Sequence, residues 1–435
     1  MAGNPHPAGM RDDTRQWIEA DLAHCWHPFT RQTEWCDRGH EPLVLVRGEG
    51  SWLWDSEGNR YLDGNSSIWT NIHGHSHPVI QSAIRAQLEN VAHTSFLGFT
   101  HPLAADLASQ LCGFFPPNTL ERVFFSDNGS TAIECALKMA VQYRQQTGQP
   151  QRNGFIAFAN GYHGDTLGAA SLGGVDRFFE RFRGTGFPVQ HATSMADLAN
   201  ISPDNIAGVV IEPLIQGVNE MRPWPTGMLG ELRNWCDVNG VHLILDEVMT
   251  GFGRTGSMFA CQLEQVIPDF LCLAKGLTGG YLPLAATLTT GRVYDAFLGG
   301  ADRAFYYGHS YTANPLGCAA ALASLSLFNF EKTLEQLPAK IERLSAGLAG
   351  LQSRHPLVHE IRQCGLIAGI ELRRPDGSHF PVAERVGESV CFSARAFGLL
   401  TRPILDTIVL MPPLSTSLEE IDHAVSALDS ALSAI

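Results

Sequence analysis

Five short apolar runs, separated by stretches of helical periodicity, limit what this chain can fold into. They occupy residues 122–127, 154–160, 206–213, 241–247 and 269–275. Each run is continuous and bounded by turn residues, which is typical of a strand buried on both faces. Strands that alternate with helices form β–α units around a mainly parallel sheet. The sequence therefore predicts an α/β fold.

The composition argues for a globular chain and against a nucleic-acid partner. Hydrophobic residues make up 44% of the 435 positions and charged residues 17%, so the chain can bury a large core. The formal net charge is −14. Because phosphate binding needs a basic surface, we expect no nucleic-acid partner.

Cysteine usage and hydropathy suggest a cytoplasmic protein with no membrane contact. The first residues contain no stretch that could act as a signal peptide, and no apolar run approaches the roughly 18 residues of a membrane span. The ten cysteines form no C-x-x-C pair. Reduced thiols are therefore expected, with neither a zinc site nor a disulfide framework.

Polar or glycine-rich residues stand at or just after the end of each of the five runs. In an open parallel sheet, ligands bind beyond the carboxyl ends of the strands. Each feature alone is weak, but their coincidence predicts one shared site. The features are Asn128-Gly129-Ser130-Thr131, Gly161-Tyr162-His163, Glu212, Asp246 and Lys275.

Lys275 and Asp246 suggest a cofactor. A lysine at the mouth of a buried strand is partly desolvated, which favours the neutral amine that forms an imine with a carbonyl. An aspartate on a nearby strand can keep a pyridine nitrogen protonated, as in binding of pyridoxal phosphate. The alternatives are a surface lysine whose amine reaches solvent and a carboxylate that caps the next turn.

A phosphate site is predicted at the start of the helix after residue 127. Backbone amides at a helix N-terminus attract anions, Gly129 permits close approach and Ser130 supplies a hydroxyl. An ordinary Ser/Thr helix cap is the alternative. The ring of Tyr162 could stack on a pyridine face, or pack as a lone aromatic. The segment GHSYTANPLG, residues 308–317, is a second candidate anion site.

From about residue 26 to the C-terminus the chain resembles a fold-type I, class III (ω-amino acid) aminotransferase. The motifs are LILDEVMTGFGRTG, LAKGLTGG, SDNGSTAIECALKMA, NGYHGDT and GHSYTAN. WHPFT at 26–30, DGNSSIWTNIHGHSHP at 63–78, ALKMAVQY at 136–143 and LLTRP…IVLMPP at 399–413 narrow the likeness to the branch that serves biotin biosynthesis.

The resemblance implies an architecture. The large domain would hold a mainly parallel, seven-stranded sheet, and both termini would build a smaller α/β domain. We expect a flexible leader at 1–12, an N-terminal segment of the small domain at 13–75, the large domain at 76–320 and the C-terminal small domain at 321–435. A homodimer with shared active sites is also implied.

The resemblance also implies roles for single residues. Lys275 would be the imine-forming lysine, Asp246 the partner of the ring nitrogen, and Tyr162 the residue that stacks on the cofactor. Gly129 and Ser130 would bind the phosphate, with His309 and Ser310 arriving from a second subunit. Arg402 would take the substrate carboxylate through its bidentate fork. An apolar sleeve for 8-amino-7-oxononanoate would come from Tyr162 together with three further positions, Phe29, Ile68 and Trp69, with Gly308 beside them. Trp69 as core packing is the alternative.

Two positions leave the amino donor open. Members that use S-adenosylmethionine typically carry Tyr in W-x-P-Y-T and a Trp pair after D-G-x-S-S, where this chain has Phe29 and Ile68. With these two residues and the segment GHSYTAN, the chain resembles members that take the amino group from lysine. The competing hypotheses are another class III transaminase, acting on pyruvate or 4-aminobutyrate, an isomerase or racemase on the same scaffold, and a non-catalytic binding module.

Overall fold

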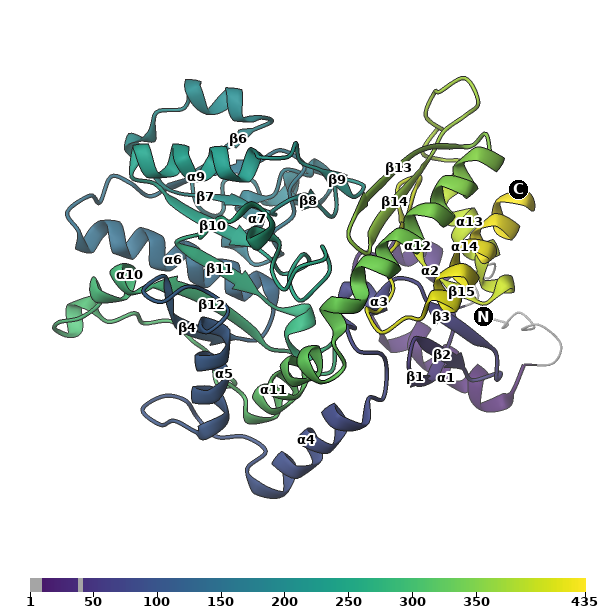
Figure 1. The fold of residues 1–435 in the computed structure, drawn as a ribbon, viewed down its shortest axis with the longest axis horizontal. Helices are drawn as coiled ribbons and strands as arrows, with labels where there is room; N and C mark the ends of the chain where they lie inside the picture. The colour runs from purple at the N-terminus through teal and green to yellow at the C-terminus, as the bar shows by residue number, and fades with distance from the viewer. Residues whose placement is uncertain (1–9, 38–41) are drawn as a thin grey trace.

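The computed structural model describes residues 10–37 and 42–435, arranged in two lobes (Figure 1). The predicted leader falls largely on residues 1–9, outside the described part, and the first helix begins at Asp12. Within the described residues, no helix combines the length and apolar character that a membrane span requires. The predicted fold class is confirmed: the larger lobe is an α/β unit with a seven-stranded, mainly parallel sheet.

The large sheet has the strand order β4-β12-β11-β10-β7-β5-β6. Its strands β5, β6, β7, β10 and β11 run parallel, while β12 is antiparallel to both of its neighbours. All five predicted strands are present, and β6 and β12 were not predicted. The bounds are β4 (Leu120–Ser126), β5 (Gly154–Phe158), β6 (Val189–Ala192), β7 (Ile206–Ile211), β10 (His242–Asp246), β11 (Phe270–Leu273) and β12 (Ala285–Thr290).

Helices cover both faces of this sheet, which is why its central strands are buried at every position. Along β10, Ile244 packs in the core on the α6 and α7 side, while Leu243 and Leu245 pack in the core that includes α9 and α11. The helices of this lobe are α4 (Pro78–Asn90), α5 (Pro102–Cys112), α6 (Gly129–Gln146), α7 (Leu167–Leu172), α8 (Asp176–Phe179), α9 (Met228–Asn239), α10 (Gly291–Asp295) and α11 (Pro315–Phe330).

Both ends of the chain build the smaller lobe, where the first strands and the last helices lie together in Figure 1. Strand β3 pairs in parallel with β15, through Leu62 and Leu399. The two four-stranded sheets have the orders β1-β2-β3-β15 and β13-β14-β17-β16. Their strands are β1 (Leu45–Glu49), β2 (Trp52–Asp55), β3 (Arg60–Asp63), β13 (Val358–Cys364), β14 (Ile367–Leu372), β15 (Leu399–Leu400), β16 (Arg402–Ile404) and β17 (Thr407–Leu410), with helices α1 (Asp12–His24), α2 (Gln32–Trp35), α12 (Thr333–Arg354), α13 (Val386–Ala394) and α14 (Leu418–Ser433).

One predicted helix is too long. The sequence suggests a single helix over residues 314–337, but α11 ends at Phe330 and α12 begins at Thr333. Lys332 between them adopts a left-handed backbone (φ 52°), which breaks the helical hydrogen bonding. Residue 320, where the large domain was predicted to end, lies inside α11, which packs against α4 and α5.

The short helix α3 (Ser66–Trp69) has an unusual backbone. All four residues have positive φ, between 46° and 68°, although none is glycine. A left-handed residue other than glycine costs about 1–2 kcal/mol, so the surroundings must hold this turn in place. Ser66 donates its hydroxyl to the Met411 carbonyl (2.7 Å), and the Ser67 amide and hydroxyl both bind Asp63.

Candidate active site

A cavity of about 440 Å³ opens at the carboxyl edge of the large sheet. Its position is the one expected for a ligand site in an open α/β sheet. All five predicted strand-end features contribute to it. The lining includes Trp69, Gly129, Ser130, Tyr162, His163, Glu212, Val218, Val248, Met249, Asp246, Lys275 and the segment 280–284.

Asp246 has a buried histidine as its partner. Its Oδ2 lies 2.8 Å from Nδ1 of His163, and its Oδ1 accepts the Val248 amide. Burial alone would lower the pKa of His163, but the hydrogen bond and the charge of Asp246 raise it above its ordinary value. A protonated or Nδ1–H imidazole therefore fixes one carboxylate oxygen and orients the acid within the cavity.

Glu212, at the end of β7, is a second buried acid beside this pair. It accepts backbone amides from Gly217 (2.9 Å) and Tyr162 (3.3 Å). Burial raises its pKa to about 7, with the negative charge of Asp246 acting in the same direction and His163 opposing it. These two amide contacts hold the carboxylate at the strand end, where the sequence places it.

Lys275 projects into the same cavity from the turn after β11. Its Nζ lies 4.8 Å from the centre of the Trp69 ring. Burial lowers its pKa, although the charges of Asp246 and Glu212 act in the opposite direction. Strands β10 and β11 are adjacent and parallel, with Asp246 opposite Cys272. Lys275 and Asp246 therefore lie at the ends of neighbouring strands, as the sequence allowed, and the partly buried Lys275 lines the cavity.

The N-terminus of α6 is arranged to receive an anion. The cap is Asn128, whose side chain accepts the Thr131 amide, so Ser130 is not the cap residue. The first amides of a helix have no partner within the helix. Gly129 packs against Val248, since a Cβ there would lie 2.7 Å from a Val248 methyl. Ser130 accepts the Asp165 amide (3.0 Å) and keeps its hydroxyl proton for another acceptor.

Tyr162 forms one wall of the cavity within an aromatic group. Its ring stacks on Phe179 at 5.9 Å and meets Phe29 edge-on at 6.3 Å. Its hydroxyl donates to Asp165 (2.6 Å), and burial together with this bond raises its pKa. Phe178 joins the group at 5.5 Å from Phe29. These contacts hold the Tyr162 ring in place at the wall of the cavity that Lys275 also lines.

Several residues assigned by resemblance lie outside this chain's own cavity. Phe29 is 61% exposed and reaches the site only through Tyr162 and Phe178, while Ile68 is 45% exposed. Arg402 begins β16 with an exposed side chain. The remaining three, Gly308, His309 and Ser310, lie in a loop before α11, where His309 Nε2 is 4.0 Å from Asp127. Their proposed roles stay predictions.

Sequence reasoning gave no role to His163, although it lies in the quoted motif NGYHGDT. It assigned Asp246, and not the adjacent Glu247, to the site. Glu247 points into the protein and accepts the amides of Ala260 (2.7 Å) and Cys261 (2.8 Å). Glu247 therefore anchors the turn at residues 260–261, and Asp246 alone lines the cavity.

Comparison with known families agrees with this geometry. The family model described as aminotransferase class-III matches residues 35–432. The chain belongs to the class III aminotransferases.

Curated relatives in this family cover nearly the whole chain. A protein of Geobacter sulfurreducens is 45% identical over 97% of this chain and 98% of its own length. A protein of Nitratidesulfovibrio vulgaris is 46% identical over 95% of this chain and 81% of its own. Both are named adenosylmethionine-8-amino-7-oxononanoate aminotransferase.

Solved structures are also similar. The protein of that name from Methanocaldococcus jannaschii has a TM-score of 0.93 at 39% identity, covering 97% of this chain and 99% of its own. An amine transaminase from an uncultivated Pseudomonas species, solved in its PLP-bound form, has a TM-score of 0.88 at 34% identity, covering 94% and 98%.

This aminotransferase uses pyridoxal 5'-phosphate, and the cavity meets the requirements of that cofactor. The amine of a partly buried lysine, a buried carboxylate and a helix N-terminus border one space. Lys275 would hold the aldehyde carbon, Asp246 the ring nitrogen, and the turn 128–130 the phosphate. When bound, the cofactor supplies an electron sink for the carbon that loses or gains the amino group.

Proposed function

We propose that this aminotransferase converts 8-amino-7-oxononanoate to 7,8-diaminononanoate in biotin biosynthesis. The observation that carries the proposal is the shared name of relatives that are 41–46% identical over at least 95% of the chain. Residues of this chain do the positioning and the proton transfer. Lys275 accepts and returns the proton at the reacting carbon, because its lowered pKa makes the neutral amine accessible.

The shape of the substrate supports the same proposal. 8-Amino-7-oxononanoate is a long apolar chain with one carboxylate at its far end, so its site needs apolar walls and one cation. Trp69, Val218 and Met249 provide apolar walls within the cavity. We assign the carboxylate to Arg402, whose exposed guanidinium on β16 is available for bidentate pairing.

S-Adenosylmethionine is the proposed amino donor, because the relatives carry it in their name. Lysine is the second candidate. Phe29 stands where users of S-adenosylmethionine typically have tyrosine, and it packs on Phe178 through an edge-to-face contact that needs no hydroxyl. A pocket without that hydroxyl has one fewer group to hold a sulfonium nucleoside.

A donor panel tests both parts of the proposal. The cofactor-loaded enzyme is given 8-amino-7-oxononanoate at fixed concentration and either S-adenosylmethionine or L-lysine, and 7,8-diaminononanoate is measured. We expect product with S-adenosylmethionine. Product with lysine alone overturns the donor assignment only. Faster turnover of pyruvate than of 8-amino-7-oxononanoate overturns the acceptor assignment, and racemisation without loss of donor amino groups overturns transamination.

We further propose a cytoplasmic homodimer with shared active sites. Large apolar side chains are exposed on two neighbouring loops, at Leu97 (88%), Phe99 (69%) and Tyr306 (83%). The loops touch where the rings of His93 and Tyr311 meet at a tilt of 33°, with their centres 4.6 Å apart. Exposed apolar groups of this size favour a protein partner, and a second copy would bring His309 and Ser310 to the other cavity. A monomer by light scattering at micromolar concentration would contradict the assignment.

A further inference from the structure

The turn at residues 217–221 stands between the cavity and the small lobe. On the cavity side, Gly217 donates its amide to Glu212, and Val218 forms part of the lining. A Cβ on Gly217 would lie 2.6 Å from the sulfur of Met249 and 3.2 Å from the Trp69 ring. This side of the turn is therefore packed directly against the walls of the substrate site.

The other side of the turn packs on the small-lobe sheet. Met221 is fully buried in a cluster with Ile367 and Val409, from β14 and β17. Gly369 on β14 permits the approach, since a Cβ there would lie 2.9 Å from the Met221 Cβ and 3.0 Å from the Glu220 carbonyl. Glu220 and Met221 both have positive φ (56° and 54°), so the turn needs external support.

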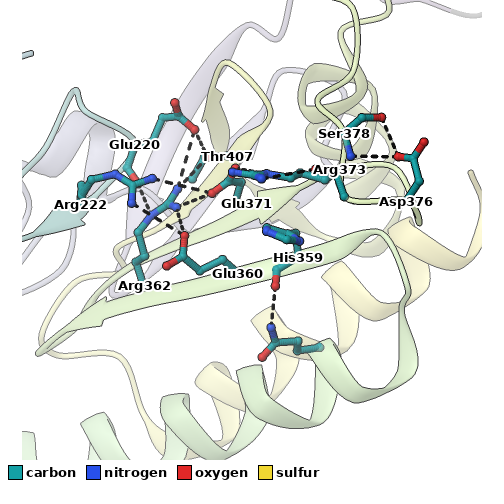
Figure 2. A network of polar contacts seen from close by, with 12 residues as sticks. Glu220, Arg222, His359, Glu360, Arg362, Glu371, Arg373, Asp376, Ser378 and Thr407 are labelled. Atoms are coloured by element: carbon teal, nitrogen blue, oxygen red, sulfur yellow. Dashed lines mark hydrogen bonds and ion pairs between the residues drawn. The ribbon is translucent and has the colours of Figure 1, made fainter.

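Arg362 on β13 supplies polar support from the small lobe (Figure 2). Its Nε donates to the Glu220 carbonyl (2.9 Å), and a terminal nitrogen donates to the Thr407 hydroxyl (3.1 Å). Thr407 in turn donates to the Glu220 carboxylate (2.6 Å). One guanidinium and one hydroxyl thus hold both the main chain and the side chain of Glu220.

Two acids keep the Arg362 guanidinium in this orientation. Its other terminal nitrogen binds Glu371 and Glu360. Burial tends to raise the pKa of Glu371, but hydrogen bonds from Arg362 and Arg373 lower it to about 2, so Glu371 is charged at neutral pH. Arg373 binds Glu371 from the far side (2.6 Å) and reaches Gly377, away from the turn.

We propose that Arg362 is a positioning residue of the aminotransferase. From the small lobe it fixes the turn 217–221, and through the turn it holds Val218 and the Glu212 contact in the substrate cavity. The turn borders the binding space but supplies no group that exchanges a proton. Loosening it therefore weakens substrate binding, because the wall must be ordered each time a substrate binds, while the chemical step is preserved.

Arg362→Gln and Arg373→Gln form a matched pair, because both remove a guanidinium from Glu371 and only the first touches the turn. We expect Arg362→Gln to raise KM for 8-amino-7-oxononanoate about tenfold with kcat within about twofold. Hydrogen–deuterium exchange of peptides spanning residues 213–223 should also be faster. Arg373→Gln should lower Tm without either change. A lower Tm for Arg362→Gln with wild-type KM and wild-type exchange at 213–223 overturns the proposal.

A milder variant keeps the test decisive if Arg362→Gln does not fold. Thr407→Val preserves the shape of the side chain and removes the hydroxyl between Arg362 and Glu220. We expect a smaller increase in KM, about threefold, again with kcat nearly unchanged and faster exchange at 213–223. If Thr407→Val leaves both KM and exchange unchanged, the proposal is also overturned. The choice of substrate rests on the proposed function. If the wild-type enzyme does not convert 8-amino-7-oxononanoate, that function fails, while exchange at 213–223 still tests Arg362.

Discussion

The side-chain nitrogen of Lys275 lies 4.8 Å from the centre of the Trp69 ring, and both residues line the cavity that Asp246 borders. The lysine is partly buried, and its backbone has a positive φ (40°) in the turn that follows β11. An amine desolvated in this way, against an aromatic face, is arranged for reaction rather than for stability.

Lys275→Ala should abolish transamination without weakening the fold. We expect a loss of at least about 10²-fold, the low end for a residue that carries a proton, with Tm no lower than that of the cofactor-free wild type. The control is Lys340→Ala, because Lys340 is also a buried amine whose pKa is lowered by burial, yet it binds the Leu414 carbonyl in the small lobe. The control should stay active; comparable activity in both variants would contradict the role of Lys275.

Glu212→Gln should change how stability depends on pH. The pKa of Glu212 is about 7 in the folded protein against an ordinary 4.5, because burial disfavours the charged form. The stability contributed by its protonated form is complete below pH 4.5 and is lost as the pH rises through about 7. Between these limits the wild type should lose about 3 kcal/mol relative to the Gln variant.

Urea unfolding of both proteins from pH 5 to 8 measures this difference. Glu19→Gln, an exposed change on α1, serves as the control and should run parallel to the wild type. A wild-type curve that stays parallel to that of Glu212→Gln over the whole range would show that Glu212 does not titrate there.

Ile68→Asn should stabilise the enzyme. Ile68 is a β-branched residue at φ 65°, a conformation that asparagine tolerates far better, and its side chain is 45% exposed. We expect a gain of about 1 kcal/mol in the free energy of unfolding. Val46→Asn, in the exposed face of β1, should give no gain. Calorimetry measures both, and a destabilised Ile68→Asn would mean that the side chain has a packing role.

Gly164→Ala should weaken cofactor binding. Gly164 has φ 122°, and a Cβ there would lie 2.1 Å from the Ser130 hydroxyl at the proposed phosphate site. Displacing that hydroxyl should cost about tenfold or more in affinity for pyridoxal phosphate, the value of one or two lost hydrogen bonds. Gly148→Ala shares the positive φ (80°) but has open space around it. A titration that finds equal affinities in the two variants would argue against the site.

The strands that sequence could predict are those buried on both faces. Strand β7 is apolar throughout, and β10 is apolar at its three central residues, 243–245, so their pattern is visible without tertiary information. Strand β12 was missed because it carries buried threonines. Thr287 and Thr289 are tolerated only because their hydroxyls bind the carbonyls of Ala132 (2.8 Å) and Asp269 (3.0 Å) on other elements.

The residues of the candidate site also fall into those that a local sequence pattern can place and those that depend on tertiary packing. Lys275, Asp246 and Ser130 could be placed because each follows its own strand, and parallel strands end at one edge. The contact between His163 and Asp246 spans 83 positions, and that between Arg362 and Glu220 spans 142. No local pattern encodes such pairings, since they depend on how the elements pack.

The left-handed turn at Ser66–Trp69 makes the position of an active-site ring depend on both ends of the chain. Its hydroxyl bond to the Met411 carbonyl is formed by a segment that follows almost the whole chain. The Trp69 ring above the lysine is therefore set in place only when the C-terminal strands have been made and docked. A ribosome-bound chain that lacks them has the reactive amine but not its aromatic cover, and removing Met411 and the residues after it should damage a cavity that those residues do not line.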